Sequence, residues 1–160
     1  FKVKDVSIKP ISPQSNGVPV LVAAHGRSKL DRQYKRVLLG DGLISISDFP
    51  DEYELVLNKV SDYFDSDDSG FTKMEKSFYM TVNMGDNQEK LIEESDHFLK
   101  SYYGVNIWQE RWGPWGSPEE VVARIKTYEN VGAETIIVRF ASYNQPAQLD
   151  LFLNQVVPNL

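Results

Sequence analysis

Apolar stretches that predict strands alternate along this chain with segments of helical periodicity. Residues 18–22 are apolar and β-branched without polar alternation, which predicts a strand buried on both faces, as in a parallel sheet. Further strands are predicted at 43–47, 76–82 and 134–140, with helices at about 28–39, 48–64, 86–102, 117–131 and 146–157. Strands and helices therefore alternate through the whole chain.

This alternation predicts an α/β fold with about four parallel strands. Strands that are each followed by a helix pair in parallel through right-handed crossovers. Two closures remain open at this level, a small doubly wound sheet or half of an eight-stranded barrel. At 160 residues the chain is most economically one domain with a substantial core.

Capping residues mark several of the predicted helix starts. The clearest signal is Ser117-Pro118-Glu119-Glu120, with a hydroxyl at the cap, a proline at the first helical position and a glutamate at the third. Gly132 is predicted to end that helix. Ser28 and Asp48 are predicted to cap the first and second helices.

The charge balance narrows the classes of partner. There are 23 acidic and 17 basic residues, a net charge of −6, and no basic stripe, so we expect no nucleic-acid partner. The absence of cysteine excludes disulfides and thiolate metal sites and is typical of a reducing compartment. No apolar run approaches the roughly 18 residues of a membrane span, and no signal-peptide pattern is present. We therefore expect a cytoplasmic protein without a membrane partner.

The first predicted strand ends in a turn with the chemistry of an anion site. Ala24 and Gly26 are small enough for a ligand to approach the backbone closely. The free amides of a helix that starts at Ser28 favour a phosphate or carboxylate, and His25 and Arg27 would lie beside that anion. The alternative is an ordinary strand-turn-helix connection with a capping serine and a surface arginine.

Two patterns that could suggest a metal site do not hold up. The acidic loop 65–70 matches the first positions of a calcium loop, but Lys76 stands where a bidentate glutamate is required. His97 lies in a predicted helix, with no second His or Cys at ligand spacing. We therefore expect no metal.

The order of motifs resembles that of a known enzyme family. Near the C-terminus stand a Gly-Ser-Pro-Glu-Glu helix start at 116–120, an apolar strand that ends in Arg139-Phe140, and a last helix that ends in Val-Val-Pro-Asn-Leu at 156–160. The strand end at 19–26, a helix, and a Gly-Asp-Gly turn at 40–42 precede them. This series resembles the second half of bacterial-luciferase-like flavin-dependent oxidoreductases.

The resemblance implies the C-terminal half of a (β/α)8 TIM barrel. Residues 1–160 would form a single partial domain, with 103–116 as an irregular Trp-rich lid or insert. Barrel enzymes build their sites around the whole mouth, and an isolated half would expose two sheet edges. The chain also lacks an initiator methionine. We therefore expect a fragment of a longer polypeptide or a half held by the N-terminal half of the same barrel, inactive alone; a homo-oligomer is a further option.

The resemblance also implies site residues. A flavin phosphate would bind at the turn formed by Ala24, His25, Gly26, Arg27 and Ser28. The lid would offer Trp108, Arg111, Trp112 and Trp115 for stacking on a flat ring or on an anionic substrate. The alternative is that the tryptophans pack as a hydrophobic plug on the barrel exterior. No catalytic residue is assigned among the polar strand ends, which are Ser45, Ser47, Arg139 and Ser142, because strand boundaries decide which side chains face the mouth.

The implied activity is that of a luciferase-like monooxygenase, acting on a small organic substrate with reduced FMN and oxygen. Luciferases often carry Glu-Ser where this chain has Ala24-His25, whereas deazaflavin-using relatives often carry Ala-Ala-x-Gly, which this chain matches better. A deazaflavin-dependent hydride-transfer enzyme on the same fold therefore stays an alternative. A third is a non-catalytic half-barrel that binds a ligand or serves as a subunit.

Overall fold

The structure is a computed structural model that describes residues 4, 9–15, 17–64, 69–107 and 109–160. Its strands are β1 (Leu21–Ala23), β2 (Gly42–Ile46), β3 (Glu75–Met84), β4 (Trp115–Gly116) and β5 (Thr135–Phe140). Its helices are α1 (Arg32–Val37), α2 (Pro50–Ser61), α3 (Gly70–Lys73), α4 (Gln88–Tyr103), α5 (Pro118–Asn130) and α6 (Gln145–Leu151). Helix α6 continues into a π-helical turn, Phe152–Val156. The four predicted strands are confirmed as β1, β2, β3 and β5, apart from their ends.

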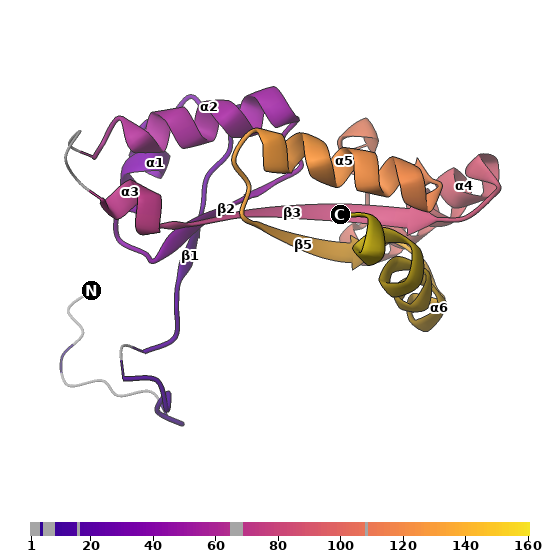
Figure 1. The fold of residues 1–160 in the computed structure, drawn as a ribbon, viewed down its shortest axis with the longest axis horizontal. Helices are drawn as coiled ribbons and strands as arrows, with labels where there is room; N and C mark the ends of the chain where they lie inside the picture. The colour runs from indigo at the N-terminus through magenta and orange to yellow at the C-terminus, as the bar shows by residue number, and fades with distance from the viewer. Residues whose placement is uncertain (1–3, 5–8, 16, 65–68, 108) are drawn as a thin grey trace.

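All pairings in the sheet are parallel, and the long strands follow one another in chain order. β1 pairs with β2, β2 with β3, and β3 with β5. A doubly wound sheet reverses its strand order at a switch point, so this order excludes that closure and matches a section of a barrel. The short β4 pairs with Asn83–Met84 at the end of β3. Figure 1 shows the long β3 at the centre of the sheet, with α2 and α5 along one side.

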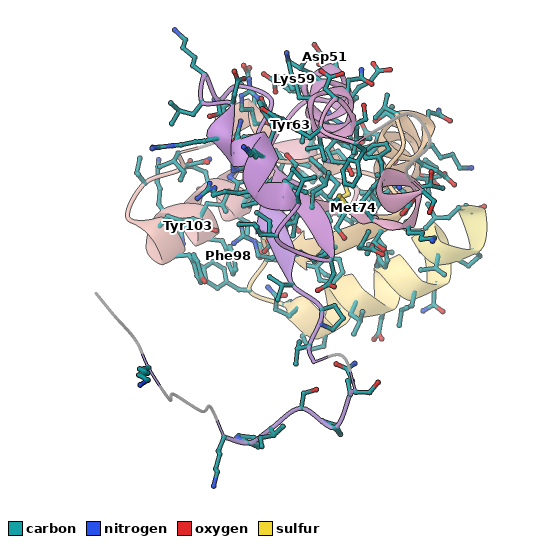
Figure 2. The ribbon with its side chains drawn as sticks, turned by 90° about the vertical axis from the view of Figure 1, so that its left-hand side faces the viewer. Asp51, Lys59, Tyr63, Met74, Phe98 and Tyr103 are labelled. Carbon is teal, nitrogen blue, oxygen red and sulfur yellow. The ribbon has the colours of Figure 1, made fainter. Side chains whose placement is uncertain are left out.

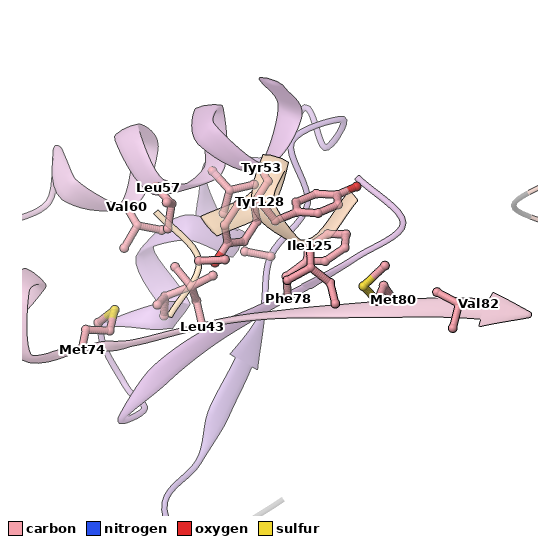
Figure 3. Packing of buried hydrophobic residues seen from close by; sticks show 14 of the residues in the cluster. Leu43, Tyr53, Leu57, Val60, Met74, Phe78, Met80, Val82, Ile125 and Tyr128 are labelled. Atoms are coloured by element: carbon pink, nitrogen blue, oxygen red, sulfur yellow. The ribbon is translucent and has the colours of Figure 1, made fainter. Parts of the chain in front are cut away.

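The face of the sheet toward α2 and α5 is apolar. Phe78 and Met80 project from β3 toward these two helices (Figure 3) and are almost completely buried. The ring of Phe78 stacks on Tyr128 with centroids 3.8 Å apart and meets Tyr53 edge to face at 5.4 Å. Such contacts add to the free energy of apolar burial. This cluster is the main core, and four residues of α2 at helical spacing belong to it, which are Tyr53, Val56, Leu57 and Val60.

The opposite face of the sheet is polar. Ser77, Thr81 and Asn83 alternate on β3 with the apolar residues and are completely buried. The end of α4 and the segment before α5 cover this face, where Leu99 and Trp112 form a second, smaller cluster. The polar face therefore lies where the interior of a barrel would be.

The helix that begins after Ser117 forms as predicted. The Ser117 hydroxyl accepts from the Glu120 amide at 3.4 Å, and the Glu120 carboxylate accepts from the Ser117 amide at 2.7 Å. Gly132 follows the helix with φ of +104°, a conformation that favours glycine.

Three other local predictions are wrong. Val18 and Val20 are 68% and 55% exposed, because the strand begins only at Leu21 and β1 lies at an edge of the sheet. Helix α1 starts at Arg32, so Ser28 does not cap it. Helix α2 has Phe49 at its cap, because Asp48 turns inward to other partners.

Candidate functional site

Three segments meet where the parallel strands end. They are the turn after β1 (24–28), the loop after β2 (47–49) and the described residues of the segment before α5 (103–107 and 109–116). Ligands of parallel α/β sheets and barrels bind at the carboxyl ends of the strands. This edge is therefore the candidate functional site.

Four of the five backbone amides of the turn, those of Ala24, His25, Gly26 and Ser28, donate to acceptors within the chain. The His25 amide donates to Gln33 Oε1 at 3.1 Å, and the Gly26 amide donates to Asp48 Oδ2 at 2.8 Å. The Ser28 amide donates to the His25 carbonyl at 3.2 Å. An anion at this turn would therefore bind through the side chains of His25, Arg27 and Ser28 rather than through a cradle of amides.

The close approach of helix α2 requires a glycine at position 26, whether or not a ligand binds there. A Cβ at this position would lie 2.4 Å from the Glu52 carbonyl oxygen and 2.8 Å from the Glu52 Cβ. Any larger residue would push the turn away from α2. The predicted role of Gly26 in phosphate binding stays a prediction, since close packing already explains the glycine.

Asp48 joins the turn to the loop after β2. Its side chain is completely buried, and Oδ2 accepts from Ser45 Oγ at 2.6 Å as well as from the Gly26 amide. The Tyr128 hydroxyl donates to its carbonyl at 2.7 Å. His25 Nδ1 lies 3.9 Å from Oδ2, which makes an ion pair only when His25 is protonated. A buried carboxylate disfavours a second anion nearby, so phosphate binding here needs the positive charge of Arg27 or His25.

Arg111 ties the segment before α5 to the loop after β2. Its guanidinium binds both carboxylate oxygens of Glu52, with Nη2 2.9 Å from Oε1, and also donates to the Ser47 carbonyl at 3.1 Å. It lies 4.4 Å from the centre of the Phe49 ring. The hydrogen bonds from Arg111 lower the pKa of Glu52 and raise that of Arg111. The structure thus uses the Arg111 charge for an internal ion pair, and a contact with substrate stays a prediction.

Two of the tryptophans predicted to form a lid pack on the polar face. Trp112 is 4% exposed and belongs to the cluster with Leu99, and the half-buried Trp115 packs against that cluster from β4. Trp108 lies outside the described residues. Trp112 and Trp115 therefore pack on the face of the candidate site and not on the outside of the barrel, where the alternative placed them. Their contact with a cofactor or substrate stays a prediction.

Arg139 is held among aromatic rings on the polar face. Its Nε donates to Thr81 Oγ1 at 3.2 Å, and Nη1 donates to the Tyr103 hydroxyl at 2.8 Å. The guanidinium carbon lies 5.0 Å from the Trp112 ring centre and 5.6 Å from that of Tyr79. The sequence pattern placed Arg139 at a strand end, but it gave no signal for these rings, which come from β3, from α4 and from the segment before α5.

Glu94 on α4 organises the chain that follows β5. It accepts from the Ser142 hydroxyl at 2.8 Å, from the Tyr143 amide at 2.9 Å and from Asn83 Nδ2 at 3.0 Å. Sequence reasoning missed Glu94, Asp48 and Glu52 as site residues, because each acts on a partner far away in the chain. The one available signal was the position of Asp48 directly after a predicted strand.

Beside Glu94, a surface pocket of about 500 Å³ is lined by residues of α4 and by Tyr143. No group of three or more potential metal ligands occurs in the described part of the chain, and loop residues 65–68 lie outside it. No described helix is both long and apolar enough to cross a bilayer.

Comparison with known proteins finds a likeness in structure. No family model and no curated protein matches the sequence. A solved structure of an "F420-dependent secondary alcohol dehydrogenase in complex with an F420-acetone adduct" matches with a TM-score of 0.70 at 16% identity, over 91% of this chain and 49% of that one. A structure of apo-MsnO8 matches with a TM-score of 0.62 at 11% identity, over 98% and 54%. The chain thus spans about half the length of each, and the resemblance seen in the sequence is confirmed at the level of fold.

Proposed function

We propose that this chain, whose fold is that of about half of a bacterial-luciferase-like TIM barrel, is part of an oxidoreductase that uses reduced FMN and oxygen to monooxygenate a small organic substrate. The observation that supports the proposal most is the meeting of three segments at the carboxyl ends of the strands, where Asp48 and Arg111 join them. Barrel enzymes place their chemistry at this edge.

The side chains at this edge suit different parts of a flavin. His25 and Arg27 offer positive charge to the phosphate, and the Ser28 hydroxyl offers a hydrogen bond. Trp112 and Leu99 form a small buried apolar cluster on the polar face, which in the complete site would help to keep water from the flavin. The flavin, when bound, supplies the electron transfer, while the protein positions it and its substrate.

The proposed site needs the other half of a barrel mouth. In the described residues β1 pairs only with β2, and β5 pairs only with β3. Open edges of this kind bind further strands readily. We therefore place the N-terminal half of the barrel, in the same polypeptide or as a separate chain, against these two edges.

A comparison of FMN with riboflavin tests the phosphate role directly. Arg27→Ala should weaken FMN binding by roughly tenfold, as expected for loss of a charged hydrogen-bond donor, while riboflavin, which has no phosphate, should bind as before. Binding is followed by flavin absorbance and fluorescence in the complete barrel. Lys90→Ala on α4 is the control for charge. Equal losses for both ligands, or none, would contradict the phosphate role.

A deazaflavin-dependent dehydrogenase is the second candidate. It is favoured by the Ala23-Ala24-His25-Gly26 sequence, which matches the Ala-Ala-x-Gly pattern, and by the fold match to a dehydrogenase that is described as F420-dependent. NADH-driven oxygen uptake in the presence of FMN would support the monooxygenase. Substrate oxidation that depends on added deazaflavin, without oxygen uptake, would support the dehydrogenase. If a complete barrel gives neither signal, the remaining candidate is a non-catalytic binding protein.

A further inference from the structure

The Glu52 carboxylate interacts with two arginines from different parts of the candidate site. Arg111, in the segment before α5, binds it with both terminal nitrogens, and the two side chains are only 18% and 19% exposed. These hydrogen bonds are the main reason that the pKa of Glu52 is lowered, and the charge of Arg27 in the turn after β1 lowers it further. The turn itself touches Glu52, because a Cβ at Gly26 would lie 2.8 Å from the Glu52 Cβ.

Arg111 also holds the loop after β2 in an unusual conformation. Its guanidinium donates to the Ser47 carbonyl at 3.1 Å. Ser47 has a φ of +57°, the one positive value at a residue other than glycine in the described part of the chain. Backbone held in this region is often found at functional sites. Asp48 follows directly, and its buried carboxylate accepts from the Gly26 amide at 2.8 Å. Arg111 is therefore linked to the turn through this loop as well as through Glu52.

We propose that Arg111 is a positioning residue for the flavin phosphate, which by neutralising Glu52 reduces the competition between this carboxylate and the phosphate for Arg27. The inference rests on the proposed function, in which Arg27 binds that phosphate. With Arg111 in place, two arginines balance the carboxylates of Asp48 and Glu52. Without Arg111, both carboxylates face Arg27, and a phosphate would approach a site of net negative charge.

The link between Arg111 and the phosphate acts in both directions. A coupling between two sites is reciprocal, so a bound phosphate stabilises the Arg111–Glu52 pair by the same factor by which the pair strengthens phosphate binding. Trp112, the next residue in the chain, packs in the cluster with Leu99 on the polar face. Phosphate binding therefore helps to fix the segment before α5 over that face.

The affinities of the complete barrel for FMN and for riboflavin test the inference, and pH 8 keeps both Glu52 and the phosphate ionised. Arg111→Met should weaken FMN binding about tenfold more than riboflavin binding. Addition of Glu52→Gln to this variant should bring the ratio of the two affinities back to within about threefold of wild type, because the competing carboxylate is gone. Rescue of this kind separates positioning from a direct contact of Arg111 with the flavin, which Glu52→Gln would not restore.

Lys59→Met is the matched control for charge. Lys59 is exposed on α2, the helix that carries Glu52 (Figure 2), and forms no salt bridge with a described residue, so its loss should leave the affinity ratio unchanged. Circular dichroism melts check the fold of each variant.

Two results overturn the inference alone. One is an unchanged ratio in Arg111→Met where Arg27→Ala lowers it, and the other is a loss in Arg111→Met that Glu52→Gln does not restore. An unchanged ratio in Arg27→Ala overturns the phosphate site itself, and the inference with it.

Discussion

The two faces of β3 are equally buried but are stabilised in different ways. On the face toward the helices, Phe78 is held by apolar area and by ring contacts with Tyr128 and Tyr53. On the other face, Thr81 and Asn83 are held by hydrogen bonds that lead to other elements. Burial alone therefore does not distinguish the face that stabilises the fold from the face that carries the candidate site.

The difference predicts where substitutions act. The apolar face contributes most of the free energy of folding, because area removed from water dominates that term. The polar face contributes less, because its hydrogen bonds replace bonds to water. The polar face should instead control the position of the segment before α5 and the dependence of stability on pH.

The largest effect is expected on the apolar face. Phe78→Ala should lower the free energy of unfolding by about 3–5 kcal/mol, because it leaves a cavity between two tyrosine rings. Urea titration followed by circular dichroism measures the loss. Val20→Ala, at an exposed position before β1, should change the free energy of unfolding by less than about 0.5 kcal/mol. Similar losses for the two variants would contradict the assignment of the core.

An intermediate effect is expected at Arg139. Arg139→Met should cost about 1–3 kcal/mol, because it leaves the Tyr103 and Thr81 hydroxyls without their partner and removes a cation from the aromatic rings. Tryptophan fluorescence should shift to the red as Trp112 becomes exposed. Arg139→Lys, which keeps the charge, should shift it less. An unchanged emission spectrum would show that Arg139 does not hold this segment.

The smallest effect on stability is expected at low pH, through Glu94. Partial burial alone would raise the pKa of Glu94, but hydrogen bonds from Asn83, Tyr143 and Ser142 lower it below its usual value. This contribution to stability is present above the unfolded-state pKa of about 4.3 and is lost as the pH falls through the folded-state value. We expect a loss of about 1 kcal/mol in acid. Glu94→Gln should remove that part of the pH dependence, whereas Glu89→Gln at an exposed site should not; equal pH profiles for the two would refute the role of Glu94.

The sequence was sufficient where local chemistry decides the structure. The capping box at Ser117 and the glycine that ends α5 involve residues close together in the chain, so their pattern predicts their geometry. The apolar positions of α2 follow from helical periodicity in the same way. The order of these elements left a doubly wound sheet and half of a barrel open, and only the resemblance to a family selected the barrel.

The site was less predictable because its contacts span long stretches of chain. Asp48 is suited to cap a helix, but the Gly26 amide, 22 residues away, takes its carboxylate. Arg111 was expected to face a ligand, but Glu52, 59 residues away, binds its guanidinium. Tertiary partners of this kind leave no periodic signal in one sequence.

Gly26 has a consequence for recognising proteins like this one. Its missing Cβ lets the Glu52 backbone of α2 approach the turn, so a motif search that requires glycine here selects for tight helix packing. Such a search would recover chains that share the architecture, whether or not they still bind a cofactor. A search meant to recover the chemistry should instead ask for positive charge at Arg27 and for a carboxylate at Asp48.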